Sequence, residues 1–277
     1  MADPNERKLY RIGDYARYMG VTPDFLKHYE ENGLLAVHYT SSGYRYYDFD
    51  QSSRILEYMR LRNYGVNVRD MNRMLCAEDN EALRLLDEKA ESLRAEVRRI
   101  EAVLAEHERV KVWYERRLQR PVDWEVRGVE PCWFLPHANA RDFERDERVY
   151  PLLKQWVEWM PVVKSALRVT PSPGENPYTT QWGLILRSSL ARQFGIPLGE
   201  PLVAMPGGKA FVYHFVGLER EFSIDEIARG HHPMFEQMEK LGLRAAKDAY
   251  LVVEMKLTKA DGNRRGGSGR FIVPLAD

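Results

Sequence analysis

Cationic and hydrogen-bonding side chains occur at two nearby places in the first fifty residues, and their chemistry suits nucleic acid. Lys27 and His28 are adjacent, and Tyr44 and Arg45 follow Gly43. Ammonium and guanidinium groups pair with phosphate oxygens, and several polar side chains bond to base edges. The alternative is ordinary surface charge and hairpin packing. The elements that hold these side chains must decide between the two.

A second set of side chains could bind an apolar ligand. All six tryptophans lie from Trp113 onward, among many other aromatic residues. Aromatic rings hold flat or cationic molecules by stacking and cation–π contacts. The alternative is that these rings are core, and we expect this of about half of them. We predict ligand-binding residues at Trp133, Tyr150, Trp182, Tyr213 and Tyr250, with Glu254 as a carboxylate.

Metal and catalytic chemistry find little support in the sequence. Cys76 and Cys132 are the only cysteines, and no histidine stands at metal-ligand spacing from either. We therefore predict no metal, no cofactor, no disulfide framework and a reducing cytoplasmic location. A phosphate-binding glycine loop, a nucleophile elbow and a paired-histidine motif are all missing, which indicates a protein that is not an enzyme.

The elements around Lys27 and Arg45 are predicted from local signals. Apolar residues at helical spacing indicate a helix over 12–19, and Gly20 ends it. Thr22 and Pro23 are typical of the cap and first position of a second helix, which Gly33 ends. Two β-prone runs then flank Ser41-Ser42-Gly43 and predict a hairpin. The pattern predicts a helix-turn-helix with a wing.

Five short blocks resemble the MerR family of regulators over roughly residues 9–77. They are Tyr10-Arg11-Ile12-Gly13-Asp14, Gly20-Val21-Thr22, Leu26-Lys27-His28-Tyr29-Glu30, Gly33-Leu34-Leu35 and Gly43-Tyr44-Arg45-Tyr46-Tyr47. Lys27 and His28 stand where the family usually has Arg and Tyr. The resemblance implies a DNA-binding domain over 1–77 and a palindromic promoter site. We assign the DNA interface to Thr22, Asp24, Lys27, His28, Tyr29, Tyr39, Ser41, Gly43, Tyr44, Arg45 and Arg62.

A long connecting helix follows, since residues 66–120 contain neither glycine nor proline. Apolar or small residues recur at alternating spacings of four and three, as in a coiled-coil seam: Leu86, Ala90, Leu93, Val97, Ile100 and Leu104. We predict a dimerisation helix over 78–120 that forms an antiparallel coiled coil with a second chain. The alternative is a helix packed lengthwise on its own C-terminal domain.

The remaining residues, 121–277, predict a repeated strand-helix-strand-strand order and hence an α+β domain. The first copy has strands near 124–135, 181–190 and 200–205, with a helix near 146–163. The second has strands at 209–216, 249–257 and 270–275, with a helix at 233–241. Such a duplication gives a curved antiparallel sheet with helices on one face and a ligand site on the other.

The run from Pro206 to Gly217, with Val273-Pro274-Leu275, looks like a GyrI-like effector-binding domain. Joined to a MerR-like N-terminus, it resembles multidrug-sensing regulators, which implies large, often cationic, aromatic effectors. Many members have an acidic residue where this sequence has Arg270, so Glu254 would have to supply the carboxylate. Some GyrI-like domains are hydrolases that use a Glu and a Tyr, and Glu254 and Tyr250 are the candidates for that alternative.

Lysines and arginines number 41, as do aspartates and glutamates, so DNA contact must come from local charge placement. No apolar run is long enough to span a bilayer. We predict a homodimeric regulator that binds double-stranded promoter DNA and a small aromatic or hydrophobic effector, and that activates RNA polymerase indirectly by distorting DNA. The alternatives are a ligand-released repressor, a hydrolase, or a drug-sequestering protein with a DNA-binding module.

Overall fold

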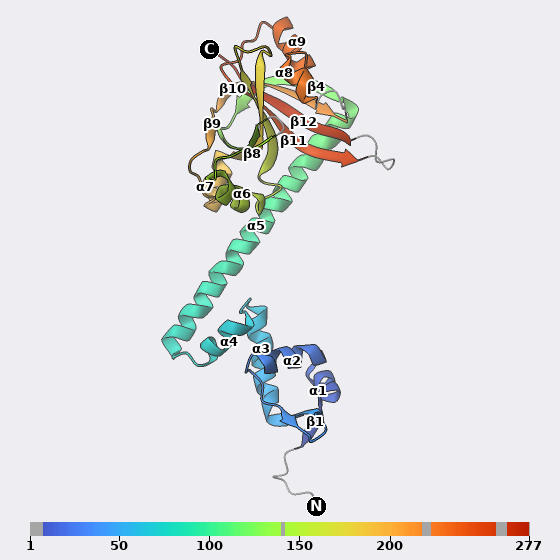
Figure 1. The fold of residues 1–277 in the computed structure, drawn as a ribbon, viewed down its shortest axis with the longest axis vertical. Helices are drawn as coiled ribbons and strands as arrows, with labels where there is room; N and C mark the ends of the chain where they lie inside the picture. The colour runs from blue at the N-terminus through green and yellow to red at the C-terminus, as the bar shows by residue number, and fades with distance from the viewer. Residues whose placement is uncertain (1–7, 140–141, 218–222, 259–264, 277) are drawn as a thin grey trace, which may run out of the picture. The chain divides into compact units, whose positions relative to one another are not determined.

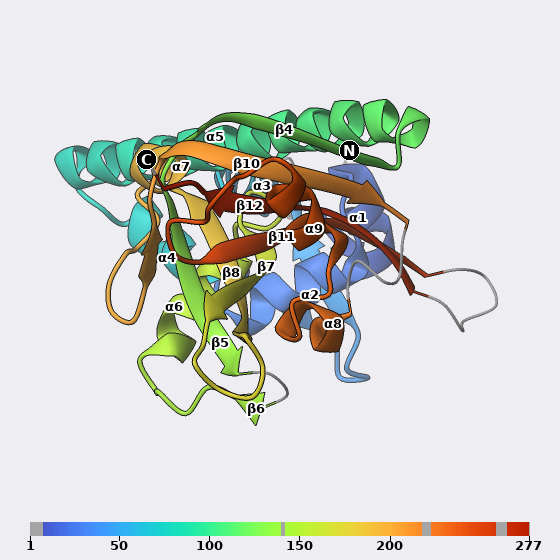
Figure 2. The same cartoon turned by 90° about the horizontal axis from the view of Figure 1, so that it is seen from above.

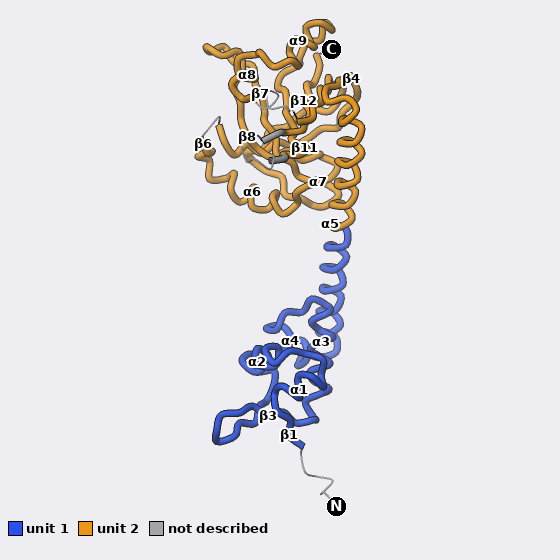
Figure 3. The backbone as a smooth tube through the Cα atoms, turned by 90° about the vertical axis from the view of Figure 1, so that its right-hand side faces the viewer, with its two compact units in different colours: residues 1–98 blue, residues 99–277 orange. Residues whose placement is uncertain are grey.

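A computed structural model describes residues 8–139, 142–217, 223–258 and 265–276. The chain divides into two compact units, residues 1–98 and 99–277 (Figure 3).

The N-terminal unit is a small helical domain with a three-stranded sheet (Figure 1). Its elements are β1 (Leu9–Arg11), α1 (Ile12–Met19), α2 (Pro23–Glu31), β2 (His38–Tyr39), β3 (Arg45–Asp48), the 3-10 turn η1 (Phe49–Gln51), α3 (Ser52–Asn63) and α4 (Val68–Leu75). The sheet order is β1-β3-β2, so β1 adds a strand to the predicted hairpin.

The predicted helix-turn-helix signals are confirmed. Gly20 has a φ of 68°, and its N–H donates to the carbonyls of the last turn of α1. Thr22 Oγ1 accepts from Phe25 N at 3.1 Å, which starts α2 with Pro23 in its first turn. The apolar faces of α1 to α4 meet in one core, which includes Tyr15, Leu26 and Ile55.

The long helix α5 (Asp79–Gln119) has 41 residues. It carries both the apolar seam predicted for a coiled coil and charged side chains on the rest of its surface. Ion pairs one turn apart, such as Arg94–Glu91 at 2.5 Å, cover part of its surface. Four seam residues remain largely exposed in the single chain, with exposed fractions of 44% to 61%: Leu93, Val97, Ile100 and Leu104. A different stripe, which includes Trp113 and Arg117, is buried.

The C-terminal unit is built on an antiparallel sheet of nine strands with the order β4-β10-β12-β11-β7-β8-β5-β6, where β9 also pairs with β5 (Figures 1 and 2). The strands are β4 (Val122–Val129), β5 (Cys132–Asn139), β6 (Asp142–Phe143), β7 (Lys164–Pro171), β8 (Tyr178–Arg187), β9 (Val203–Met205), β10 (Gly208–Val216), β11 (Ala249–Thr258) and β12 (Arg265–Pro274). The helices are α6 (Val149–Val157), α7 (Ser188–Phe194), α8 (Ile224–Ala228) and α9 (Pro233–Lys240).

The strand-helix-strand-strand order occurs twice, as β5-α6-β7-β8, with the two-residue strand β6 between β5 and α6, and as β10-α8-α9-β11-β12. The two copies meet where β7 pairs with β11. Several predicted boundaries are wrong. The predicted strand at 124–135 is two strands, β4 and β5, because residues 130–131 interrupt it and the two parts join different places in the sheet. Strand β7 was not predicted, and α7 occupies the end of the strand predicted for 181–190.

The two faces of this sheet are covered differently. The outer face packs against α6 to α9 and includes Leu167, Tyr213 and Phe271. The inner face carries a smaller apolar cluster with Phe134 and Val252. Residues of α5 from Glu106 to Arg117 contact the inner face, as the hydrogen bonds below show (Figure 2).

Candidate DNA-binding surface and ligand cavity

The wing is tied to helix α2 by a small polar cluster. Glu30, at the end of α2, accepts a 2.8 Å hydrogen bond from Arg45 Nε and another from the Tyr39 hydroxyl. The Arg45 guanidinium also lies 5.4 Å from the centre of the Tyr39 ring. The turn between β2 and β3 needs Gly43, whose φ is 78°. The helix and the wing therefore hold one another in place.

The structure places most of the predicted DNA-contacting side chains on the surface. Lys27 and Arg45 are half-buried, and the exposed ones are Thr22, Asp24, His28, Tyr39, Ser41, Gly43, Tyr44 and Arg62. Lys27 Nζ pairs with Asp24 Oδ1 at 2.9 Å. Tyr29 differs, because it is buried in the core and stacks on Phe25 with ring centres 4.0 Å apart.

A groove of about 840 Å³ lies beside α2. Its walls include His28 and Arg62, together with Asn67 and Arg69 at the start of α4. Asn67 Oδ1 accepts from Asp70 N at 2.9 Å and caps α4. Sequence reasoning missed Asn67 and Arg69 as surface candidates. An asparagine directly before a helical run was the available signal.

A cavity of about 410 Å³ opens on the inner face of the C-terminal sheet. Its apolar wall is formed by Val129, Cys132, Val162, Ile185, Met205, Val252 and Ile272. Its charged wall is formed by Arg109, Arg127, Glu130, Lys164, Arg187 and Arg270. Helix α5 supplies Arg109, and the other charged residues come from the sheet or from the connection between β4 and β5.

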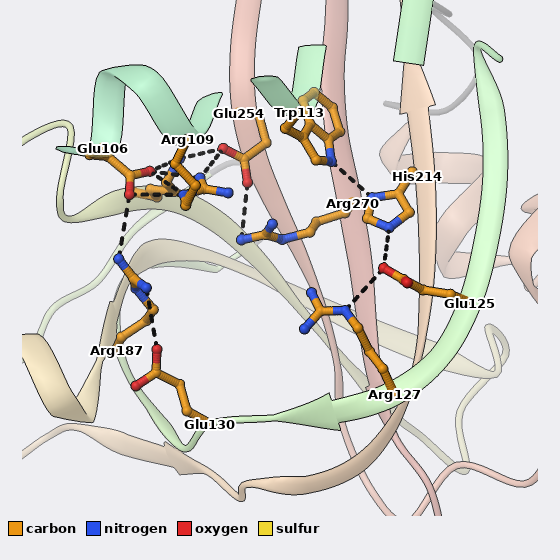
Figure 4. Close-up of polar contacts among 11 residues, drawn as sticks. Glu106, Arg109, Trp113, Glu125, Arg127, Glu130, Arg187, His214, Glu254 and Arg270 are labelled. Carbon is orange, nitrogen blue, oxygen red and sulfur yellow. Dashed lines mark hydrogen bonds and ion pairs between the residues drawn. The ribbon is translucent and has the colours of Figure 1, made fainter. Parts of the chain in front are cut away.

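Ion pairs join the charged wall to two buried carboxylates (Figure 4). Glu254, with no exposed side chain, contacts Arg109 at 2.8 Å, Arg270 at 3.1 Å and Lys164. Glu106 of α5 contacts Arg109 at 2.6 Å and Lys164 at 2.7 Å. Burial alone would raise the pKa of Glu254, but the charges of Arg270, Lys164 and Arg109 lower it to about 2.

A second chain of hydrogen bonds links α5 to the cavity (Figure 4). Trp113 Nε1 donates to His214 Nδ1 at 3.0 Å, and His214 Nε2 lies 3.2 Å from Glu125, which pairs with Arg127 at 3.0 Å. Because Nδ1 accepts, His214 is neutral with its proton on Nε2. Burial, together with the charge of Arg117, lowers the pKa of His214 to about 4.

The predicted ligand-binding residues are not gathered at one place. Tyr250 belongs to the inner-face cluster and Glu254 pairs with cations of the cavity wall, but neither is among the residues that line the cavity. Trp133, Trp182 and Tyr213 pack on the outer face. Tyr150 lies on α6 and its hydroxyl donates to the Glu144 carbonyl. The cationic wall was missed, since its members are far apart in sequence.

Among the described residues, no group of three or more His, Cys, Asp or Glu side chains is arranged to hold a metal ion. Within the same residues, no helix combines the length and the apolar composition that crossing a membrane requires.

The N-terminal geometry defines a winged helix-turn-helix domain. The family model described as "MerR HTH family regulatory protein" matches residues 10–78. The nodulation protein NolA of Bradyrhizobium sp. strain NC92 is 37% identical over 70 residues. That match covers 25% of this chain and 30% of NolA, and NolA of Bradyrhizobium elkanii is 36% identical over the same length. Residues 10–78 thus match the MerR helix-turn-helix family model, and the chain spans less than a third of the length of these relatives.

Two solved structures are similar at a low level. A MerR-family transcriptional regulator from Bacillus cereus has a TM-score of 0.36 and 23% identity, and the match covers 39% of this chain and 84% of that one. The EcmrR–DNA complex has a TM-score of 0.37 and 12% identity, over 97% of this chain and all of the other. Similarity at this level carries no functional inference.

Proposed function

We propose that this protein is an effector-responsive transcriptional regulator that binds a palindromic promoter site as a homodimer in the cytoplasm. The observation that carries the proposal is the match to the MerR helix-turn-helix model, in which the second helix and the wing present exposed polar side chains beside the half-buried Lys27 and Arg45. The Glu30–Arg45 ion pair supports it, because it holds the wing and α2 in one arrangement before DNA binds.

Selection from a random duplex DNA pool with the full-length protein tests this proposal. A two-fold dimer should enrich a palindrome with one α2 helix in each half-site. Lys27→Ala should weaken binding to the selected duplex and reduce the salt dependence by about one ion, as the loss of a phosphate contact does. Lys154→Ala, an exposed lysine on α6, is the matched control. Failure to enrich any sequence, or equal losses in both variants, refutes the proposal.

The exposed stripe of α5 supports pairing of two chains. Leu93, Val97, Ile100 and Leu104 repeat at coiled-coil spacing and have at least 44% of their surface exposed. Trp113 and Arg117 use a different stripe of the same helix to contact the C-terminal sheet. The helix can thus pack on its own domain and still offer an apolar seam to a second chain.

The effector site in this proposal is the cavity of the C-terminal unit. Helix α5 contributes Arg109 to the cavity wall, so a bound molecule would contact the proposed dimerisation helix directly. An effector changes DNA only if it binds one conformation of the dimer better than another. Distorting a promoter site costs on the order of 1–6 kcal/mol, within reach of contacts from two helices and two wings.

We propose activation by DNA distortion, which RNA polymerase would then use. Hydroxyl-radical footprinting with and without effector tests the mechanism. The effector should change the cleavage pattern at the centre of the site more than it changes affinity. Release of the protein from an undistorted site would instead identify a ligand-released repressor.

We also propose that the C-terminal unit binds its ligand without chemistry. A general acid or base works best with a pKa near the operating pH. The pKa of Glu254 is lowered to about 2, whereas burial, with help from the charge of Asp248, raises the pKa of Tyr250 to about 12. Mass spectrometry of bound compounds after long incubation should return them unchanged. A hydrolysis product that disappears in Glu254→Gln would establish the enzyme.

A further inference from the structure

The charge of the cavity wall bears on which molecules the cavity can accept. Five cationic side chains reach the wall: Arg109, Arg127, Lys164, Arg187 and Arg270. Among the described residues that line the cavity, Glu130 is the only acid, and it already contacts Arg187 and Ser189. The wall is therefore predominantly cationic.

Glu254 cannot serve as the counter-ion of a cationic ligand in this arrangement. Its side chain has no exposed surface, and three cations surround its oxygens: Arg109, Lys164 and Arg270. A cationic ligand would have to displace one of these partners and would leave that partner buried beside the ligand's own charge. Uncompensated buried charge is strongly unfavourable.

One arginine on the wall, Arg187, is only loosely engaged. Arg187 makes contacts of 3.4 Å to both Glu106 and Glu130, and 40% of its side chain is exposed. Arg127 is held more firmly, by Glu125 of the same strand at 3.0 Å and by the Gly128 carbonyl at 3.2 Å. Charge-assisted hydrogen bonds are shorter than 3.4 Å when well formed, at about 2.7–2.9 Å. Arg187 can therefore take a better anionic partner than the two it has.

The rest of the wall is apolar. Val129, Ile185, Met205, Val252 and Ile272 surround the space beside the arginines. A volume of about 410 Å³ lies within the range of small-molecule sites, roughly 300–1,000 Å³. The site is thus divided between a cationic side and an apolar side.

We propose that this cavity binds an apolar organic carboxylate, with its anionic group at Arg187 and its apolar body against Ile185 and Met205. The ligand class follows from the cavity itself, whereas the statement that this ligand is the effector rests on the proposed function. The bound carboxylate would compete with Glu106 for Arg187. Because Glu106 belongs to α5, ligand binding would change a contact of the helix that we propose pairs the two chains.

Three ligands with one apolar body test the proposal by isothermal titration calorimetry on the full-length protein. They are 2-naphthoate, 2-naphthylmethylammonium and 2-naphthylmethanol. The carboxylate should bind about tenfold more tightly than either of the others, which is about 1.4 kcal/mol. Tighter binding of the ammonium ion, equal binding of all three, or no binding of the carboxylate at millimolar concentration overturns the proposal.

Arg187→Met locates the anionic group, because methionine keeps much of the side-chain volume without the charge. The variant should lose about fivefold or more in affinity for 2-naphthoate, the scale of one charge-assisted contact, and little for the alcohol. Arg148→Met is the control, since Arg148 pairs with Asp146 and Glu200 away from the cavity. Unchanged carboxylate affinity in Arg187→Met, or an equal loss in Arg148→Met, refutes the assignment.

DNA binding is measured separately on the same preparations. If the carboxylate binds but changes neither the affinity for DNA nor the footprint, the ligand class is supported and the effector role is refuted. If the protein binds DNA but not the carboxylate, the proposed regulator function is supported and the proposed ligand class is refuted.

Discussion

Replacing Glu254 by glutamine should destabilise the C-terminal unit in a strongly pH-dependent way. The substitution keeps the shape of the side chain but removes the charge that compensates Arg109, Lys164 and Arg270. In the folded protein the pKa of Glu254 is about 2, against an ordinary value of 4.5. At about 1.4 kcal/mol for each pKa unit, this difference corresponds to roughly 3 kcal/mol of folding free energy.

The sign of the pH dependence follows from the lowered pKa. Because the carboxyl binds its proton more weakly in the folded protein, its contribution is complete above the unfolded pKa of about 4.5. It is lost as the pH falls through the folded pKa of about 2. Wild-type protein and Glu254→Gln should therefore differ by about 3 kcal/mol at pH 7 and converge as the pH falls from about 5 toward 2.

Urea unfolding followed by tryptophan fluorescence measures this difference. All six tryptophans lie between residues 113 and 182, so the signal reports on the C-terminal unit alone. Glu236→Gln on α9 is the control, because Glu236 is exposed and should change the free energy of unfolding by less than about 0.5 kcal/mol. A loss below about 1 kcal/mol in Glu254→Gln at pH 7, or a loss that does not shrink with falling pH, would refute the assignment of Glu254 as the centre of the ion network.

Three further outcomes are expected. Leu104→Glu should shift the protein from dimer to monomer in sedimentation velocity at micromolar concentration. Val112 is an exposed apolar residue outside the heptad seam, so Val112→Glu should leave the dimer intact. A Leu104→Glu protein that stays dimeric would contradict the proposal that the seam pairs two chains. Arg45→Ala should weaken DNA binding about tenfold, in part because it leaves the Glu30 carboxylate unpaired and able to repel phosphate. Adding Glu30→Gln removes that carboxylate and should recover part of the loss. A double variant as weak as Arg45→Ala would show that Arg45 acts only by its own contact with DNA. His214 should stay neutral down to about pH 4 in NMR titrations, and a midpoint near 6.5 would contradict its burial and its bond from Trp113.

The helix-turn-helix could be predicted from the sequence because its signals are local. Thr22 accepts from a backbone N–H three residues on, and Gly20 takes a left-handed conformation that other residues disfavour. The long helix was equally predictable, since it needs only an unbroken run without glycine or proline. The second strand-helix-strand-strand copy also came from patterns within short windows, whereas the first was assigned with the wrong strands, since β7 was not predicted and β9 is not part of the repeat.

Tertiary structure alone decided where the proposed ligand cavity lies. Alternation along a strand separates two faces but does not say which one a helix covers, so Trp133 and Tyr213 were predicted at the ligand site although they pack on the outer face. The charged wall depends on strand order as well. Residues as distant as Glu106, Lys164 and Glu254 meet only because β7 pairs with β11 and α5 contacts the inner face. Ion pairing between residues so far apart leaves no periodic signal in the sequence, because it depends on through-space distance rather than on spacing along the chain.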